Sequence, residues 1–116
     1  MKMFVNTPTV YLCADFVDFR KSINGLASLV ETELELPVLS GALFVFCNKA
    51  RDKLKLLYWD QTGFALWYKR LDKQKFKWSK LQTSAISLTE EQLQWLLSGF
   101  DVIGHTQIDV NGKAVL

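Results

Sequence analysis

Positive charge is concentrated in one part of this 116-residue chain. Residues 49–80 contain ten of the fourteen Lys and Arg residues and only three acidic residues, a net charge of about +7. The rest of the chain has four basic and nine acidic side chains, about −5, so the overall net charge of +2 conceals the asymmetry. A dense positive patch attracts an anionic partner and says little about the fold, so this stretch predicts a binding surface.

Aromatic residues are interleaved with these cations. Trp59, Trp67 and Trp78 are three of the four tryptophans. Cations mixed with aromatics are typical of surfaces that bind nucleic acid, where exposed Trp and Tyr rings stack on unpaired bases. Two other interpretations remain open. The rings can be core residues on the inner face of a sheet, and the lysines can be solvated residues that discourage edge-to-edge pairing.

We expect the cations that contact phosphates to lie on the strands and turns of this stretch, with two more near the first helix. They are Arg51, Lys53, Lys55, Lys69, Arg70, Lys73, Lys75, Lys77, Arg20 and Lys21. On a strand, Lys53 and Lys55 share one face, whereas Lys69 and Arg70 point to opposite faces. No base-reading motif is present, so we expect binding to the DNA backbone with little sequence preference. For Arg20 and Lys21, simple solvation is the alternative.

Catalysis is not predicted. The single histidine, His105, is flanked by Gly104 and is expected in a surface loop. Asp15 and Asp52 belong to no paired carboxylate motif of the kind that binds two metals. A phosphate-binding glycine loop is also missing from the sequence. We therefore expect a protein that is not an enzyme and needs no cofactor.

The two cysteines, Cys13 and Cys47, are too few for a zinc site with one histidine. We expect both to be small buried residues in a reducing compartment. The sequence contains neither an apolar run long enough to span a membrane nor a secretory signal at its start. These features predict a cytoplasmic protein.

Periodicity predicts the elements that position the cations. Apolar residues at spacings of three and four, after an N-cap at Asp18 and before Pro37, predict a helix over about residues 18–35. Thr89 and Gln92 form a capping box that predicts a second helix over about residues 89–98. Strands are predicted at residues 9–13, 42–48, 53–60, 64–71, 75–79 and 82–87.

Together these elements predict an α+β fold in one domain spanning residues 1–116. Short loops join the successive middle strands, which favours an antiparallel β-meander of four to five strands packed with the two helices. A small hairpin through Asn111 and Gly112 is predicted at the C-terminal end. The oligomeric state and the strand order are not specified by the sequence.

Five stretches together resemble one protein family. They are VYLC at 10–13, DFRKSINGL at 18–26, GALFVFCNK at 41–49, KLKLLYWDQTGFALWYKRL at 53–71 and LTEEQLQWLL at 88–97. The combination is similar to the small second-open-reading-frame protein, TnpB, of the insertion-sequence-66 family of bacterial mobile elements. The resemblance covers about residues 9–100 and is far more specific than any single stretch.

The resemblance implies an accessory protein encoded beside a separate, larger transposase, with no catalytic residues to carry over. The expected partners are DNA, on the evidence of the basic stretch, and the element-encoded transposase or another transposition protein. A protein adaptor that meets the transposase without touching DNA is the alternative, with Trp95, which lies off the buried stripe of its helix, as an interface anchor. Family members often end in a basic, proline-rich tail, whereas residues 104–116 contain one Lys and no Pro.

Overall fold

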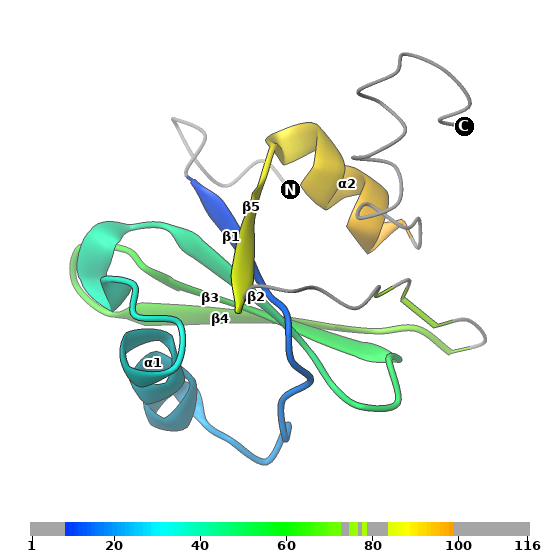
Figure 1. The fold of residues 1–116 in the computed structure, drawn as a ribbon, viewed down its shortest axis with the longest axis horizontal. Coiled ribbons are helices and arrows are strands. Elements are labelled where there is room, and N and C mark those ends of the chain that lie inside the picture. The colour runs from blue at the N-terminus through cyan, green and yellow to red at the C-terminus, as the bar shows by residue number, and fades with distance from the viewer. Residues whose placement is uncertain (1–8, 73–74, 77, 79–83, 99–116) are drawn as a thin grey trace.

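The computed structural model describes residues 9–72, 75–76, 78 and 84–98 of the chain. Within them, a mixed five-stranded sheet lies between two helices, so the predicted α+β class is confirmed (Figure 1). The strands are β1 (Val10–Cys13), β2 (Leu43–Cys47), β3 (Lys53–Trp59), β4 (Phe64–Arg70) and β5 (Ala85–Leu88). The helices are α1 (Ile23–Thr32) and α2 (Glu90–Leu97), with a short 3-10 turn over Val38–Ser40.

The sheet is not the purely antiparallel meander that the loop lengths favoured. Its strand order is β4-β3-β2-β1-β5, and β1 runs parallel to β2. The other three pairings are antiparallel. The chain between β1 and β2 contains α1 and is long enough for the crossover that parallel pairing needs. The meander prediction therefore holds for β2 to β4 and fails at the β1–β2 pair.

The β3–β4 hairpin forms at the predicted loop. The Asp60 N–H donates to the Gly63 carbonyl oxygen at 2.9 Å, and Gln61 takes a positive φ of 78°. At its base the strands pair Lys53 with Arg70, and at its tip they pair Trp59 with Phe64. The hairpin thus sets the register of the strands that carry most of the predicted binding cations.

Helix α1 begins later than predicted, and Asp18 is not its N-cap. Ser22 occupies that position without a side-chain cap bond. The Asp18 carboxylate instead accepts the Arg20 N–H at 2.9 Å, which closes a local turn ahead of the helix. Asp and Asn favour such turns because a short acceptor side chain reaches the backbone two residues on. Arg20 and Lys21 consequently lie outside the first helical turn and do not oppose the helix dipole.

Helix α2 is capped as its sequence predicts. The Gln92 N–H donates to the Thr89 hydroxyl at 3.0 Å, and the Thr89 N–H donates to the Gln92 side-chain oxygen at 2.9 Å. Leu88 and Leu93, which flank the cap, are both buried. Local chemistry therefore specifies where this helix starts.

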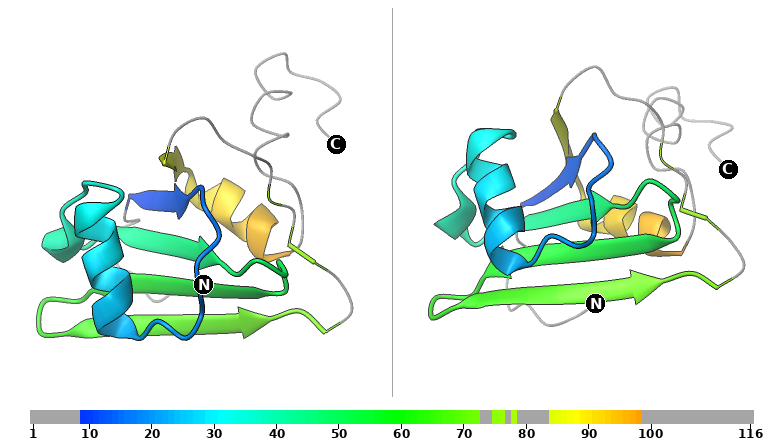
Figure 2. Two further views of the ribbon diagram at one scale, coloured as in Figure 1. Left: turned by 60° about the horizontal axis from the view of Figure 1, so that its bottom comes forward. Right: turned by 90° about the horizontal axis from the view of Figure 1, so that it is seen from below.

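Each face of the sheet carries its own apolar cluster, with α1 on one side and α2 on the other (Figure 2). Leu26 and Val30 of α1 pack with Phe44, Phe46 and other residues of the first cluster. On the second face, Leu93 and Leu96 of α2 pack with residues that include Leu54, Leu56 and Phe76. All five residues of β2 are buried, as its unbroken apolar run predicted.

The region after β4 departs from the prediction. Lys75, Phe76 and Trp78 are not in a strand, and the remaining residues of the predicted 75–79 strand lie outside the described part. Phe76 is nevertheless fully buried in the core, and its N–H donates to the Arg51 carbonyl oxygen at 2.6 Å. The predicted 82–87 strand corresponds to β5, which begins later, and residues 82–83 are outside the described set. The predicted C-terminal hairpin also lies outside it.

Both cysteines are buried free thiols. Burial raises the pKa of Cys13 to about 11 and that of Cys47 to about 12. The thiolate is the reactive form of cysteine, so neither side chain is a nucleophile at neutral pH in the folded state.

We therefore expect both thiols to resist a disulfide reagent at pH 7 until the protein unfolds. The reaction is followed by absorbance with and without denaturant, and the denatured protein is the control that shows both thiols are competent. Rapid labelling of either thiol in the native protein would contradict this assignment.

Candidate functional site

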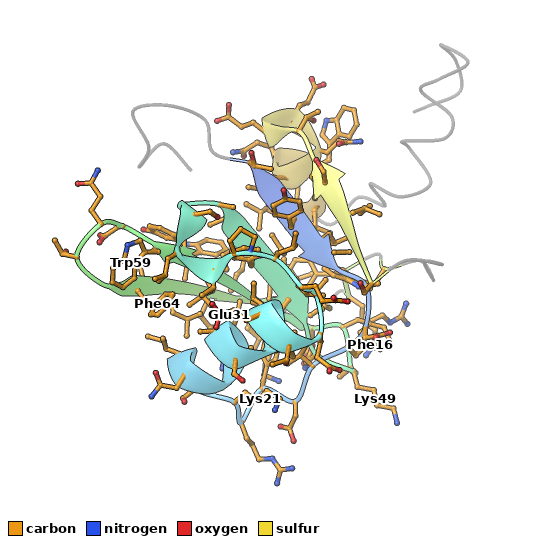
Figure 3. The ribbon with its side chains drawn as sticks, turned by 60° about the vertical axis from the view of Figure 1, so that its left-hand side comes forward. Phe16, Lys21, Glu31, Lys49, Trp59 and Phe64 are labelled. Carbon is orange, nitrogen blue, oxygen red and sulfur yellow. The ribbon has the colours of Figure 1, made fainter. Side chains whose placement is uncertain are left out.

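An open groove of about 730 Å³ lies at the base of the hairpin. It is formed by the segment that follows β1, the loop joining β2 to β3, and one residue each of β3 and β4. The lining residues that matter here are Phe16, Asp18, Arg20, Lys49, Lys53 and Tyr68. In Figure 3, Phe16 and Lys49 lie close together, away from Trp59 and Phe64 at the hairpin tip.

Two aromatic rings are exposed in this groove. Phe16 is 44% exposed and Tyr68 is 49% exposed, and Leu39 is the other large hydrophobic residue exposed in the described part of the chain. The tryptophans of the basic stretch are less accessible. Trp78 is buried and donates its indole N–H to the Ala14 carbonyl oxygen at 3.3 Å. The core interpretation of that ring is therefore the correct one.

Lys55 holds one wall of the groove in place. The residue is 9% exposed, and its Nζ donates to the carbonyl oxygens of Phe19 at 2.9 Å and Lys21 at 3.3 Å. The ammonium also lies 4.9 Å from the centre of the Phe19 ring and 6.0 Å from that of Tyr68. A desolvated cation near aromatic faces is attracted by their quadrupoles. Lys55 therefore fastens the segment before α1 to β3 and β4.

Asn48 organises the opposite wall. Its side-chain oxygen accepts the N–H groups of Asp52 at 3.1 Å and Lys53 at 3.0 Å, and its amide donates to the Asp52 carboxylate at 2.7 Å. The Asn48 hydrogen bond, aided by the Lys53 ammonium, holds the pKa of Asp52 below its usual value. The loop is tied to its neighbour as well, because the Val17 N–H donates to the Cys47 carbonyl oxygen at 2.9 Å.

The groove carries a net positive charge. Arg20, Lys49 and Lys53 contribute three cations to its lining and Asp18 one carboxylate, which leaves +2. Asp18 forms a salt bridge of 2.6 Å with Arg20. Hydrogen bonds from Arg20 lower the pKa of Asp18 to about 2, so the carboxylate is ionised at neutral pH.

The other predicted cations are divided between surfaces. Arg70 lies opposite Lys53 on the face of α1, whereas Lys69 lies opposite Leu54 on the face of α2. Lys69 donates its Nζ to the Leu97 carbonyl oxygen at 2.9 Å, at the end of α2 where a cation complements the helix dipole. Lys75 donates to the Ala50 carbonyl oxygen at 2.7 Å.

The remaining members of the predicted set lie around the groove or outside the described residues. Arg51 takes a positive φ of 63° in the β2–β3 loop, and its carbonyl oxygen binds the Phe76 N–H. Lys21 is exposed in the segment before α1. Lys73 and Lys77 are not among the described residues.

Sequence reasoning did not single out Phe16 or Lys49 as site residues. Phe16 lies outside any predicted helix or strand and next to Val17, which is equally apolar but buried, so the sequence offers no local signal that Phe16 is the exposed one. Lys49 follows the buried strand β2, where the chain emerges into a loop. Within the described residues, no three His, Cys, Asp or Glu side chains gather in a way that could hold a metal ion.

The fold and the groove define a small α+β protein with a basic, aromatic-lined binding surface. The family model described as IS66 Orf2-like protein matches residues 8–107. The chain therefore belongs to this family, whose members are accessory proteins of insertion-sequence transposition. The resemblance found in the sequence is thus confirmed.

Two relatives come from Sinorhizobium fredii. The uncharacterized protein y4hO is 37% identical over 92 residues, which cover 79% of this chain and 80% of the relative. The uncharacterized protein y4jC is 36% identical over 85 residues, which cover 73% of each chain. No solved structure gives a significant match. In the described part of the chain, neither helix has the length and apolar character needed to cross a membrane.

Lys55→Met is expected to destabilise the fold by about 1–3 kcal/mol, because the carbonyl oxygens of Phe19 and Lys21 lose a partly buried donor. Lys53→Met is the matched control, since Lys53 has the same side chain on the same face of β3 but its ammonium contacts only the adjacent Asp52 carboxylate. Urea denaturation compares the two. Equal unfolding midpoints would show that the Lys55 ammonium is not a structural tie.

Arg20→Gln is expected to raise the pKa of Asp18 from about 2 toward the ordinary aspartate value of 3.8. The lowered pKa stabilises the fold above the unfolded-state pKa, and that contribution disappears as the pH falls through the folded-state value. Carboxyl-detected NMR titration measures the shift. Lys21→Gln is the control and should move the pKa much less, while an unchanged value in Arg20→Gln would disprove the role of the salt bridge.

Proposed function

We propose that this protein binds DNA as an accessory factor of transposition, contacting the phosphate backbone through the cations around the groove. The observation that carries the proposal is the groove itself, with a net charge of +2 and two exposed aromatic rings. Neutralising phosphates releases condensed counterions and supplies affinity without sequence specificity. Membership of a transposition family supports DNA as the polyanion.

A second feature of the sheet favours an anionic partner. Lys53 and Arg70 lie directly opposite each other on β3 and β4. Like charges at such a position destabilise a sheet. Each is balanced by an acidic neighbour, Asp52 for Lys53 and Asp72 for Arg70, at distances of 3.3 Å and 3.2 Å. The Arg70–Asp72 pair is exposed, and an exposed pair is weak enough to exchange for contacts with a phosphate, whereas the Lys53–Asp52 pair is half-buried.

The described cations suit contact with the backbone better than recognition of bases. Arg20 and Lys49 emerge from loops, and Lys53 lies at the end of a strand. None of the three extends along a helix that could enter a major groove. We therefore infer binding with little preference for sequence.

A protein adaptor for the transposase is the second candidate, and the free edge of β4 favours it. β4 is a terminal strand of the sheet, and in the described part of the chain its outer edge pairs with no other strand. Such an edge can accept an extended segment from a partner by strand addition. Trp95, the anchor expected from sequence, packs partly against the core instead.

The DNA proposal is tested by fluorescence anisotropy with short labelled DNA across a salt series. Replacing Arg20, Lys49 and Lys53 together with Gln should lower the salt slope by about 0.9 for each duplex phosphate that the variant no longer neutralises. Lys69→Gln, on the opposite face of the sheet, is the control and should keep the slope. Absent or salt-independent binding would reject the proposal, as would equal decreases of the slope in the triple variant and the control.

The adaptor is distinguished by co-purification with the transposase encoded on the same element. Association that survives nuclease treatment, in a protein that does not bind DNA, would favour the adaptor over the DNA proposal. Loss of association on nuclease treatment would instead show that the two proteins are held together by DNA that both of them bind.

A further inference from the structure

We infer that the groove binds unpaired nucleotides, so that the protein prefers single-stranded DNA to duplex. This inference rests on the proposed function and adds its substrate class. Phe16 and Tyr68 expose their rings within a positively charged groove. Base faces are available to such rings only when a strand is unpaired, because a duplex hides them in its stack.

Contacts with neighbouring side chains restrain the Tyr68 ring in a position where a base can stack on it. It lies 6.4 Å from the Phe19 ring at an interplanar angle of 59°, and the Lys55 ammonium lies 6.0 Å from its centre. Lys55 and Tyr68 are also directly paired across β3 and β4. These contacts cover one part of the ring, yet 49% of Tyr68 remains exposed. An aromatic side chain fixed in this way loses little conformational entropy when a base stacks on it.

Phe16 supplies a second ring from a different element. It lies in the segment after β1, which the hydrogen bond from the Val17 N–H to the Cys47 carbonyl oxygen holds at 2.9 Å. A groove of about 730 Å³ lies within the range of sites that enclose organic ligands. Two exposed rings that line the same groove can each take a base of one strand.

The charges around the rings match a phosphodiester. Arg20, Lys49 and Lys53 line the same groove as Phe16 and Tyr68, and Asp18 is the one acidic lining residue. The Arg20 guanidinium contacts the Asp18 carboxylate at 2.6 Å. Among the described residues, Lys49 forms no salt bridge, and it lines the groove together with Phe16. The Lys49 ammonium is therefore available to a phosphate of a strand whose bases stack in the groove.

The test compares a short labelled oligothymidylate with a duplex of equal length at one ionic strength. We expect tighter binding to the oligothymidylate. Phe16→Ala and Tyr68→Ala should each weaken that binding by about five-fold or more, since stacking on one ring is worth ~1–3 kcal/mol and about 1.4 kcal/mol is tenfold. Binding to the duplex should change much less in both variants.

Two control variants separate stacking from general exposure. Tyr68→Phe keeps the ring and should retain affinity, which guards against a folding defect in Tyr68→Ala. Leu39→Ala removes a side chain that is 58% exposed and does not line the groove, and it should have no effect.

Failure of this inference is distinguishable from failure of the proposed function. Salt-dependent binding that favours the duplex, or that ignores both alanine variants, would overturn the groove assignment and leave DNA binding intact. Absence of binding to either DNA would remove both. Tighter binding of an oligouridylate than of the oligothymidylate would overturn DNA as the ligand of this groove and assign RNA instead.

Discussion

The local structure around the groove depends on one buried cation. Lys55 is on the third strand of the sequence, yet its ammonium reaches two carbonyl oxygens that precede α1 and two aromatic rings. Burying an unpaired ammonium is costly, so the buried position of Lys55 depends on these contacts. The segment that presents Phe16, Asp18 and Arg20 is therefore coupled to the register of β3 and β4. The Lys55 side chain thus holds the irregular segment between β1 and α1 in place as one wall of the groove.

Counting cations overstates the charge available to a partner. Lys55, Lys69 and Lys75 each donate to a backbone carbonyl oxygen far away in sequence. Lys53 and Arg70 have acidic neighbours within salt-bridge distance. Part of the basic stretch thus serves the fold, by satisfying carbonyl groups at loops and at the end of a helix. Of the described cations of the stretch, Lys49 and Lys53 line the groove, and Arg20 joins them from outside the stretch.

Elements with strong local chemistry could be predicted from sequence, whereas long-range pairings could not. The Thr89–Gln92 cap, the Asp60–Gly63 turn and the buried run of β2 follow from neighbouring residues alone. The parallel β1–β2 pair depends on a crossover, and no short-range signal reports it. The role of Asp18 could not be predicted from neighbouring residues either, because the same carboxylate can cap a helix or close a local turn, and here it closes the turn. The groove combines separate segments of the chain, so its aromatic residues could be recognised only in the folded protein.

The position of β1 inside the sheet has a consequence for how the chain is made. Its partner on one side is β2, but its partner on the other is β5, with Val10 paired to Leu88. The apolar cluster on the α2 face of the sheet is likewise completed only by Phe76, Trp78 and α2, which come late in the chain. During synthesis, β2 to β4 can pair as they emerge from the ribosome. The face of the sheet that α2 later covers is exposed to solvent during this time. The nascent protein therefore exposes an aggregation-prone apolar surface until α2 has left the ribosome.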